Sequence, residues 1–161
     1  MAFQARVLTV SDSASQGHAE DLSGPVVVKY LEERGFEVVD RRIVPDGVGS
    51  VAETLRDLTR GFAGLVVTTG GTGFAPRDLT PEATAEVVER QASSLAEAMH
   101  RSGPNAPLSR GLAGIVGRSI VLNLPGSPKG AVESLAAVID VLPHALALLA
   151  GEEPHSRAHS D

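Results

Sequence analysis

The chain of 161 residues contains no cysteine and no tryptophan, and aromatic residues make up only 3% of it. Without cysteine the protein can form no disulfide, no thiolate zinc site, no iron–sulfur cluster and no cysteine nucleophile. So few aromatic side chains are also too few for a base-stacking nucleic-acid surface. These absences leave oxygen and nitrogen groups to carry any chemistry.

Positive charge is scarce as well, with 14 basic against 20 acidic residues and a net charge of −6 at pH 7. That balance disfavours non-specific binding to nucleic acid or anionic lipid. No apolar run approaches the ~18 residues of a transmembrane helix, and the N-terminus lacks the basic and apolar regions of a signal peptide. We therefore expect a cytoplasmic protein with neither nucleic acid nor membrane as a partner.

The pattern of apolar residues predicts one domain over residues 1–150 and a polar, disordered tail over 151–161. Short apolar runs alternate with amphipathic stretches, which indicates a mainly parallel sheet covered by helices on both faces, an α/β fold. Strands are expected at 7–10, 36–44, 64–69, 115–116 and 119–124. Helices are expected at 23–35, 94–101 and 131–149, and from about residues 50 and 80.

Several residues predict where these helices begin or bend. Ser50 and Ser94 each precede a glutamate by three residues, the spacing of a capping box. Thr80 precedes a proline, as an N-cap residue often does. Pro143 is expected to bend the last helix.

In open α/β sheets ligands bind at the carboxyl ends of the strands, so the residues after each strand are of interest. Thr68-Thr69-Gly70-Gly71-Thr72-Gly73 continues the clearest strand. Its glycines allow close backbone approach and an anion-binding nest of N–H groups. It is neither a Walker loop nor a dinucleotide fingerprint, because no Gly-Lys-Ser/Thr follows and Pro76 takes the third glycine position. A tight strand-to-helix connection is the alternative.

Two aspartates follow strands at the same predicted edge. Asp46 ends the second strand, and Asp78 lies between the glycine loop and a helix N-terminus. Together they could hold Mg²⁺ carried by a phosphate ligand. The alternatives are a turn role for Asp46, and for Asp78 an ion pair with Arg77 or an interaction with the helix dipole.

Two further segments offer anion-binding groups. Ser109 and Arg110 supply a hydroxyl and a guanidinium suited to phosphate. The turn 125–130, which contains Lys129, opens the last helix and resembles an anion site at a helix N-terminus. A solvated arginine and a proline-stiffened turn are the alternatives. The histidines do not converge, so no histidine metal site is expected, and no Gly-x-Ser-x-Gly hydrolase elbow exists.

Six motifs follow one another in the chain between about residues 7 and 149. They are Thr9-Val10-Ser11-Asp12, Val44-Pro45-Asp46, Thr69 to Gly73, Pro76-Arg77-Asp78-Leu79-Thr80-Pro81-Glu82-Ala83, Leu108-Ser109-Arg110 with Ala113-Gly114, and Asn123 to Pro128. In this order they resemble the molybdopterin adenylyltransferase family, which includes MogA, the G domains of plants and animals, and the related MoaB proteins.

This resemblance implies a three-layer αβα sandwich, usually assembled as a homotrimer. It implies that ATP with Mg²⁺ adenylylates molybdopterin and releases pyrophosphate, ahead of molybdenum insertion by a downstream protein. By position, Asp46 and Asp78 match the essential aspartates, and we assign them to catalysis and to Mg²⁺. The family's segments that line the nucleotide and pterin site correspond in this chain to Ser11, Gly70, Gly71, Thr72, Gly73, Ser109, Arg110, Pro125, Gly126, Ser127 and Pro128.

Within that assignment the glycine loop cradles phosphates, and Ser109 with Ser127 holds the pterin phosphate. Gly47 departs from the family pattern, because many active members have glutamate there. Two alternatives to an enzyme stay open: a non-catalytic MoaB-like carrier of molybdopterin, and an assembly module like the gephyrin G domain. The two aspartates and the complete set of phosphate-type loops favour the enzyme.

Overall fold

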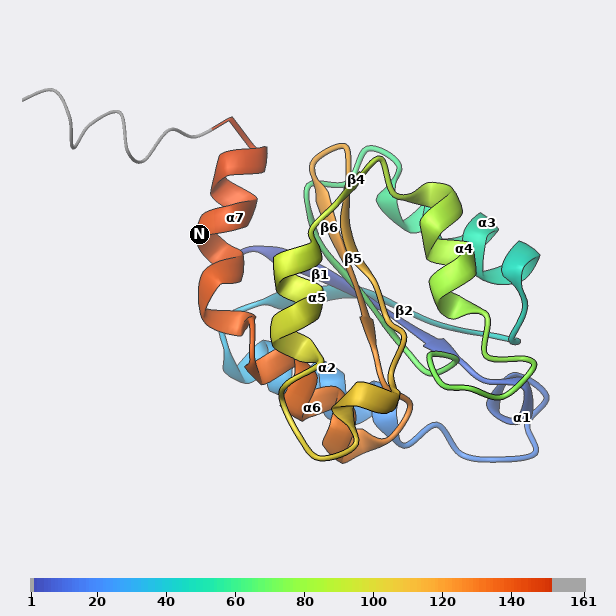
Figure 1. Ribbon diagram of the computed structural model, residues 1–161. Coiled ribbons are helices and arrows are strands. Elements are labelled where there is room, and N and C mark those ends of the chain that lie inside the picture. Colours follow the sequence, from blue (N-terminus) through green and yellow to red (C-terminus); the bar gives the residue numbers. More distant parts are fainter. Residues whose placement is uncertain (1, 152–161) are drawn as a thin grey trace, which may run out of the picture.

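The computed structural model describes residues 2–151 (Figure 1). A single six-stranded sheet runs through its centre, with the strand order β2-β1-β3-β6-β5-β4. The strands are β1 (Gln4–Val10), β2 (Glu37–Val44), β3 (Gly64–Thr69), β4 (Arg90–Gln91), β5 (Ala113–Val116) and β6 (Ser119–Leu124).

The sheet is mainly parallel, as the sequence predicts. Strands β2, β1, β3 and β6 pair in parallel, whereas β5 is antiparallel to β6 and β4 is antiparallel to β5. The antiparallel pair turns back at Gly117, whose φ of +57° suits a tight hairpin. The two-residue strand β4 was not predicted, and two residues carry too little pattern to predict one.

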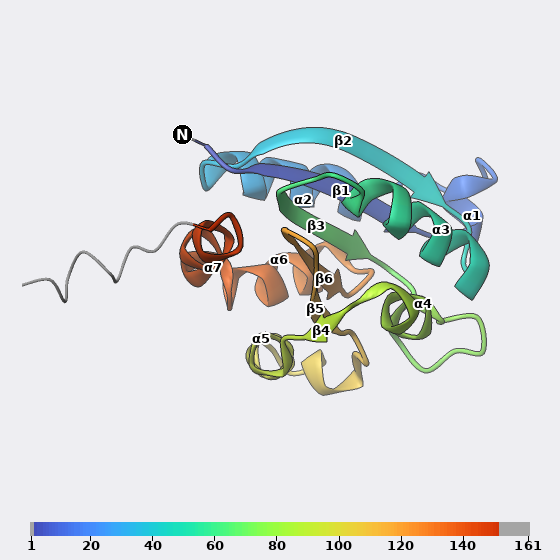
Figure 2. The ribbon, with the colours of Figure 1, turned by 90° about the horizontal axis from the view of Figure 1, so that it is seen from above.

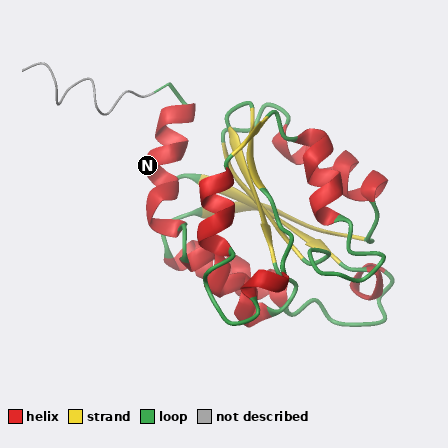
Figure 3. Ribbon diagram, in the orientation of Figure 1, coloured by secondary structure: helices red, strands yellow, loops and turns green. Residues whose placement is uncertain are grey.

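Helices cover both faces of the sheet, which confirms the predicted three-layer αβα class (Figures 2 and 3). One face carries α2, α5, α6 and α7, and the other carries α3 and α4. The helical segments are α1 (Asp12–Ser15), α2 (Ser23–Glu33), α3 (Val48–Thr59), α4 (Thr80–Val87), α5 (Ser93–Met99), η1 (Ala106–Leu108), α6 (Pro128–Ala136), η2 (Ile139–Val141) and α7 (Leu142–Leu149).

Strand β3 shows why the fold has two apolar cores. Leu65 and Val67 pack into the core under α2, α6 and α7, while Val66 between them packs under α3 and α4. Every residue of β3 is buried, because a central parallel strand has helices on both of its faces. The continuous apolar run in the sequence follows from this position.

Three predicted cap residues do not cap their helices, although each helix begins within two residues of its predicted start. Helix α3 begins at Val48 after Gly47, and Ser50 Oγ donates to the carbonyl oxygen of Pro45 over 2.9 Å. Thr80 is already inside α4, and its Oγ1 donates to the carbonyl oxygen of Gly70. Ser94 is likewise inside α5, which begins without a side-chain cap.

The predicted last helix, 131–149, is two helices in the structure. Helix α6 begins at Pro128 and ends at Ala136, and the chain from 139 to 149 is inclined to it by 45°. Pro143 lies in the first turn of α7. Its ring would clash with the carbonyl of a helical residue four positions earlier, so the interruption falls upstream of the proline.

Within residues 2–151 no single helix is long and apolar enough to cross a membrane, and only the bent pair 128–136 with 139–149 reaches that size by length and composition. The stripe Ala131, Leu135, Leu142 and Leu146 of this pair is buried in the core. The segment 11–15, for which no helix was predicted, includes the short helix α1. Of the predicted tail 151–161, residues 152–161 lie outside the part of the chain that the structure describes.

Candidate functional site

A cavity of about 370 Å³ opens at the carboxyl edge of the sheet, where β1, β2 and β3 end. Residues from six separate stretches of the chain line it. Among them are Ser11, Asp46, Gly70, Gly71, Asp78 and Gly126. The structure thus brings both predicted aspartates and part of the glycine loop to one cavity, together with Pro128.

The remaining predicted site residues lie around this cavity rather than in its lining. Thr72 and Gly73 continue the glycine loop, and Ser109 and Arg110 follow η1. A second cavity, of about 140 Å³, is lined by Asn105, Pro125, Ser127, Lys129, Gly130 and Ser134. The two cavities share the 125–128 turn, which Thr69 Oγ1 holds by donating to the carbonyl oxygen of Pro125 over 2.7 Å.

The glycine loop needs its glycines because other chain segments press against it. Gly70 has a φ of +103° and Gly71 a φ of +68°. A methyl group on Gly70 would collide with the carbonyl oxygen of Val10, and one on Gly71 would lie 3.0 Å from Asp46 Oδ1. The N–H groups of Gly71, Thr72 and Gly73 donate to no group of residues 2–151. This part of the loop therefore presents free donors, as an anion-binding nest does.

Asp46 is joined to Asp12 by two reciprocal hydrogen bonds. The Asp12 N–H donates to Asp46 Oδ2 over 3.0 Å, and the Asp46 N–H donates to Asp12 Oδ1 over 3.1 Å. Burial raises the pKa of the Asp46 carboxyl, and the nearby carboxylates of Asp12 and Asp78 raise it further, against the hydrogen bond from Asp12 and the charge of Arg77. A bound cation would relieve this repulsion.

Asp78 is held by its own turn. Its Oδ2 accepts from the Ala75 N–H over 3.0 Å, and its N–H donates to the Ala75 carbonyl oxygen. The predicted alternative, an ion pair with Arg77, is wrong, because the Arg77 guanidinium pairs with Asp12 over 2.6 Å. No lysine or arginine of the described chain forms an ion pair with Asp78.

Arg110 uses its guanidinium on the protein itself. Nε donates to the carbonyl oxygen of Gly73, Nη2 to that of Asp78, and Nη1 to the Glu82 carboxylate, over 2.8, 2.6 and 2.8 Å. Its backbone N–H donates to the Thr72 carbonyl oxygen. Arg110 thus fastens the glycine loop to α4, an arrangement that favours support of the loop over direct phosphate binding.

The two predicted serines each accept a local hydrogen bond. Ser127 caps α6 by accepting from the Gly130 N–H over 3.1 Å, and Ser109 accepts from the Gly111 N–H over 3.3 Å. A hydroxyl that accepts one bond still has its own O–H to donate. Both serines therefore keep a donor for a phosphate oxygen.

Asp21 is a site residue that our reading of the sequence missed. Its side chain is only 4% exposed, and it lines the cavity of about 370 Å³, which we call the main cavity. Oδ2 accepts from Thr9 Oγ1 and from Arg41, and Oδ1 accepts from the Gly24 N–H at the start of α2. The three-residue spacing from Asp21 to Gly24 was the available signal, because it is the spacing of a helix cap.

Gly47 has a φ of +129°, a conformation that a glutamate would adopt only with strain. Nothing but Ser50 Oγ, at 3.7 Å, lies near the position of its missing side chain. Space for a larger residue is therefore present, but the backbone conformation is one that glycine favours.

The residues fit a magnesium ion that arrives with a nucleotide. Within the described residues no group of three or more histidines, aspartates and glutamates is arranged to hold a metal. Mg²⁺ is usually bound by one or two carboxylates, with substrate phosphates and water completing its shell. Asp46 and Asp78 supply such a pair at one cavity, whereas Asp12 is engaged by Arg77.

A glycine loop with free N–H groups, beside two carboxylates at the carboxyl edge of an α/β sheet, is typical of proteins that bind a phosphate-bearing ligand. Comparison with known proteins gives the family. Residues 6–144 match the family described as "Probable molybdopterin binding domain", and the chain belongs to it.

The relatives agree with this assignment. The molybdopterin adenylyltransferase of Helicobacter pylori strain 26695 is 40% identical over 152 residues, which cover 90% of this chain and 86% of that protein. Gephyrin of Dictyostelium discoideum is 36% identical over 89% of this chain, but this chain spans only 22% of its length. The structure titled molybdopterin biosynthesis enzyme MoaB, from Thermus thermophilus, is 47% identical, with a TM-score of 0.87 over 93% of this chain and 98% of that one.

Proposed function

We propose that this protein is a molybdopterin adenylyltransferase of molybdenum cofactor biosynthesis. It transfers AMP from ATP to the terminal phosphate of molybdopterin and releases pyrophosphate. The observation that carries the proposal is the meeting of Asp46, Asp78 and the glycine loop at one cavity, in a chain 40% identical to an adenylyltransferase over most of its length.

The transfer is a displacement at the α-phosphorus of ATP. An oxygen of the molybdopterin phosphate forms a bond to this phosphorus, and the bond to the bridging oxygen of the β-phosphate breaks. Pyrophosphate leaves with the electron pair of that bond. A phosphate monoester has a second pKa of about 6 and is already anionic at neutral pH, so the attack needs no protein base.

The protein's task is to bring two anionic groups together and to align them. In this proposal the N–H groups of Gly71, Thr72 and Gly73 bind phosphate oxygens of the nucleotide, and the hydroxyls of Ser109 and Ser127 donate to the pterin phosphate. Asp46 and Asp78 would hold Mg²⁺, and the ion would supply positive charge against the α-phosphate and the leaving pyrophosphate. The two cavities on either side of the 125–128 turn are the places where we expect parts of the two substrates to bind.

The decisive experiment measures pyrophosphate release from Mg²⁺–ATP with freshly prepared molybdopterin. Release by the wild type should require the pterin. Asp78→Asn should lose it by at least about 100-fold, the scale of one lost charge-stabilising group, while keeping the wild-type melting temperature. Asp57→Asn is the matched control. Asp57 is an exposed residue of α3 that pairs with Arg60, so this variant should retain full activity.

A carrier function is the second candidate, and the 47% identity to a protein titled MoaB, together with Gly47, favours considering it. A carrier would bind molybdopterin without pyrophosphate release, and its binding would not depend on Asp78. Titration of the wild type with the pterin, run beside the pyrophosphate assay, separates the two candidates: binding without release identifies a carrier, and binding with release identifies the enzyme.

The assembly and surroundings of the protein are part of the same proposal. It acts in the cytoplasm as a homotrimer, and its adenylylated product passes to a protein that inserts molybdenum. The resemblance of the six motifs supports the trimer and the downstream protein. Light scattering on a sizing column tests the trimer, which has three times the 16.7 kDa mass of one chain.

A further inference from the structure

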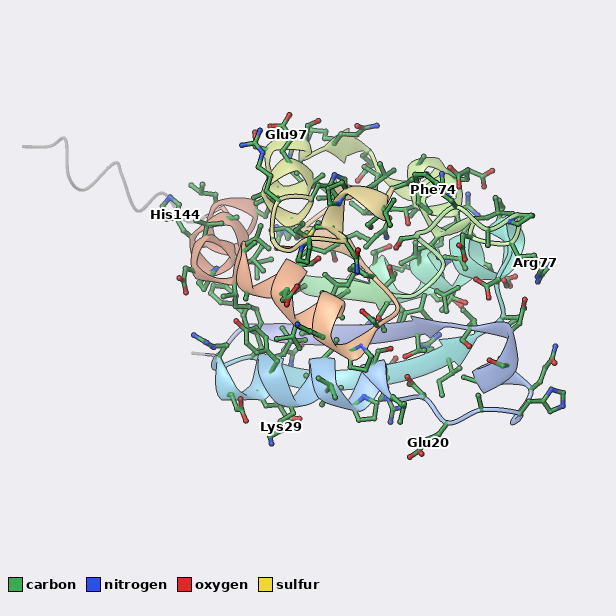
Figure 4. All side chains as sticks on the ribbon, turned by 60° about the horizontal axis from the view of Figure 1, so that its bottom comes forward. Glu20, Lys29, Phe74, Arg77, Glu97 and His144 are labelled. Atoms are coloured by element: carbon green, nitrogen blue, oxygen red, sulfur yellow. The ribbon has the colours of Figure 1, made fainter. Side chains whose placement is uncertain are left out.

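Three loops of this protein meet at one arginine. The segments after β1, β2 and β3 carry Asp12, Asp46 and Asp78. Arg77 follows β3 on the same loop as Asp78 and reaches back to the other two segments. In Figure 4 its side chain lies at the edge of the molecule where β1 and β2 end.

The contacts of Arg77 form a closed network. Nε donates to Asp12 Oδ2 over 2.6 Å, and Nη2 donates to Asp12 Oδ1 and to the Asp46 carbonyl oxygen, each over 2.9 Å. The reciprocal hydrogen bonds between Asp12 and Asp46 complete it. A guanidinium is suited to this role, because its rigid fork fixes both the distance and the angle of a carboxylate.

This network fixes Asp46 against the loop that carries Asp78. Asp46 is bound on both sides, through its N–H by Asp12 and through its carbonyl oxygen by Arg77. Asp78 is the next residue after Arg77, so the guanidinium of Arg77 holds it on one side while Arg110 holds its carbonyl oxygen. Other residues of that loop, such as Phe74, are strongly exposed and have little packing to hold them.

We infer that Arg77 is a positioning residue, whose bidentate ion pair with Asp12 sets the relative placement of Asp46 and Asp78 without contacting the substrate. This inference rests on the proposed function only where it predicts a change in the rate of the reaction. The network itself is a property of the free protein. Because the ion pair is exposed, it contributes little to overall stability, so its loss should loosen the site rather than unfold the chain.

The first experiment compares Arg77→Gln, Asp12→Asn and the double variant in the pyrophosphate-release assay. Both single variants should lower kcat about 10- to 100-fold, the range expected for a misplacement of about 1 Å. The KM for ATP should change less than about threefold. The double variant should be no slower than the slower single variant, because all three break the same ion pair.

Two further variants sharpen this test. Arg77→Lys keeps the positive charge but loses the fork, and should recover only part of kcat. Arg60→Gln is the matched control, because Arg60 pairs only with the exposed Asp57 at the end of α3 and should leave both constants unchanged. If Asp12→Asn keeps wild-type kcat while Arg77→Gln loses it, Arg77 acts on the substrate directly and the inference is overturned.

The second experiment does not need the reaction. Amide hydrogen exchange of the free protein should be faster in Arg77→Gln over residues 11–15, 45–49 and 73–79, and unchanged in the strands. Unchanged exchange in all three segments would overturn the inference. If the wild type releases no pyrophosphate, the proposed function fails, and the exchange result alone decides whether the network positions the two aspartates.

Discussion

Asp21 is a nearly buried carboxylate at the edge of the main cavity, and it is ionised because three donors reach it. Burial alone would raise its pKa, but hydrogen bonds from Arg41, the Gly24 N–H and Thr9 lower the pKa below its usual range. The ionised group therefore joins β1 and β2 to the start of α2. Charge at this position is structural, in contrast to the metal role proposed for Asp46.

A pH-dependent stability follows from that lowered pKa. A carboxyl with a lower pKa in the folded than in the unfolded state adds stability above the unfolded value, about 3.9 for aspartate, and this stability is lost as the pH falls through the folded value. Asp21→Asn should cost about 2 kcal/mol of unfolding free energy at pH 7, the scale of a lost buried charged hydrogen bond.

The cost of Asp21→Asn should shrink toward pH 3, because the wild type then loses the same interaction. Urea denaturation at both pH values measures it. Asp140→Asn, an aspartate in η2 at the exposed surface, is the control and should change stability little at either pH. An equal cost for Asp21→Asn at both pH values would contradict an ionised role for Asp21.

The sequence predicted which residues belong to the site only where they follow a strand. Asp46 and the glycine loop closely follow β2 and β3, and Asp78 lies on the loop between β3 and α4, so the rule for parallel sheets placed them at one edge. The pairing of Asp12 with Arg77 was not predictable, because 65 residues separate them in the sequence. Each could have met several other residues of opposite charge in a plausible fold. Pairing of charges is set by loop geometry, which single-sequence patterns do not contain.

At the scale of elements, the glycine loop is the part that tolerates least change. Gly70 combines a positive φ with a close approach to the Val10 carbonyl oxygen, a backbone atom that cannot rotate away. Gly70→Ala should therefore destabilise the protein by about 3 kcal/mol or more, since left-handed strain of about 1–2 kcal/mol adds to the clash.

Gly117→Ala is a matched control for that variant. Gly117 also has a positive φ, but nothing lies within 4 Å of the place where its methyl group would be. It should cost only the strain, about 1 kcal/mol. Thermal unfolding of both variants measures the difference, and equal costs would show that the approach of Val10 is unimportant.

The elements themselves were predictable to different degrees. Strand β3 and the alternation of strands with helices were clear, because a central strand between two helical layers must be apolar throughout. The capping roles predicted for Ser50, Thr80 and Ser94 were wrong. A capping pattern gives the spacing of a hydroxyl and a donor, but tertiary contacts such as that of Thr80 with Gly70 decide where the hydroxyl bonds.

At the scale of the whole molecule, the sheet separates two cores that share no side chain. Val27 of α2 is fully buried in one core, and Val51 of α3 is fully buried in the other. Each valine-to-alanine change removes two carbon atoms and leaves a small cavity, partly offset by alanine's better helix propensity. Each should cost about 1.5 kcal/mol.

The double variant Val27→Ala with Val51→Ala should lose about the sum of the two single costs, to within about 0.5 kcal/mol, because the sheet keeps the two sites apart. Urea denaturation of the four proteins of this cycle measures the coupling, and a coupling above about 1 kcal/mol would mean that the sheet transmits strain between its faces. The KM for ATP should stay the same in all four. The cavity is bounded by loops at the sheet edge, so its shape depends on the contacts of Arg77 and Arg110 rather than on how tightly either core is packed.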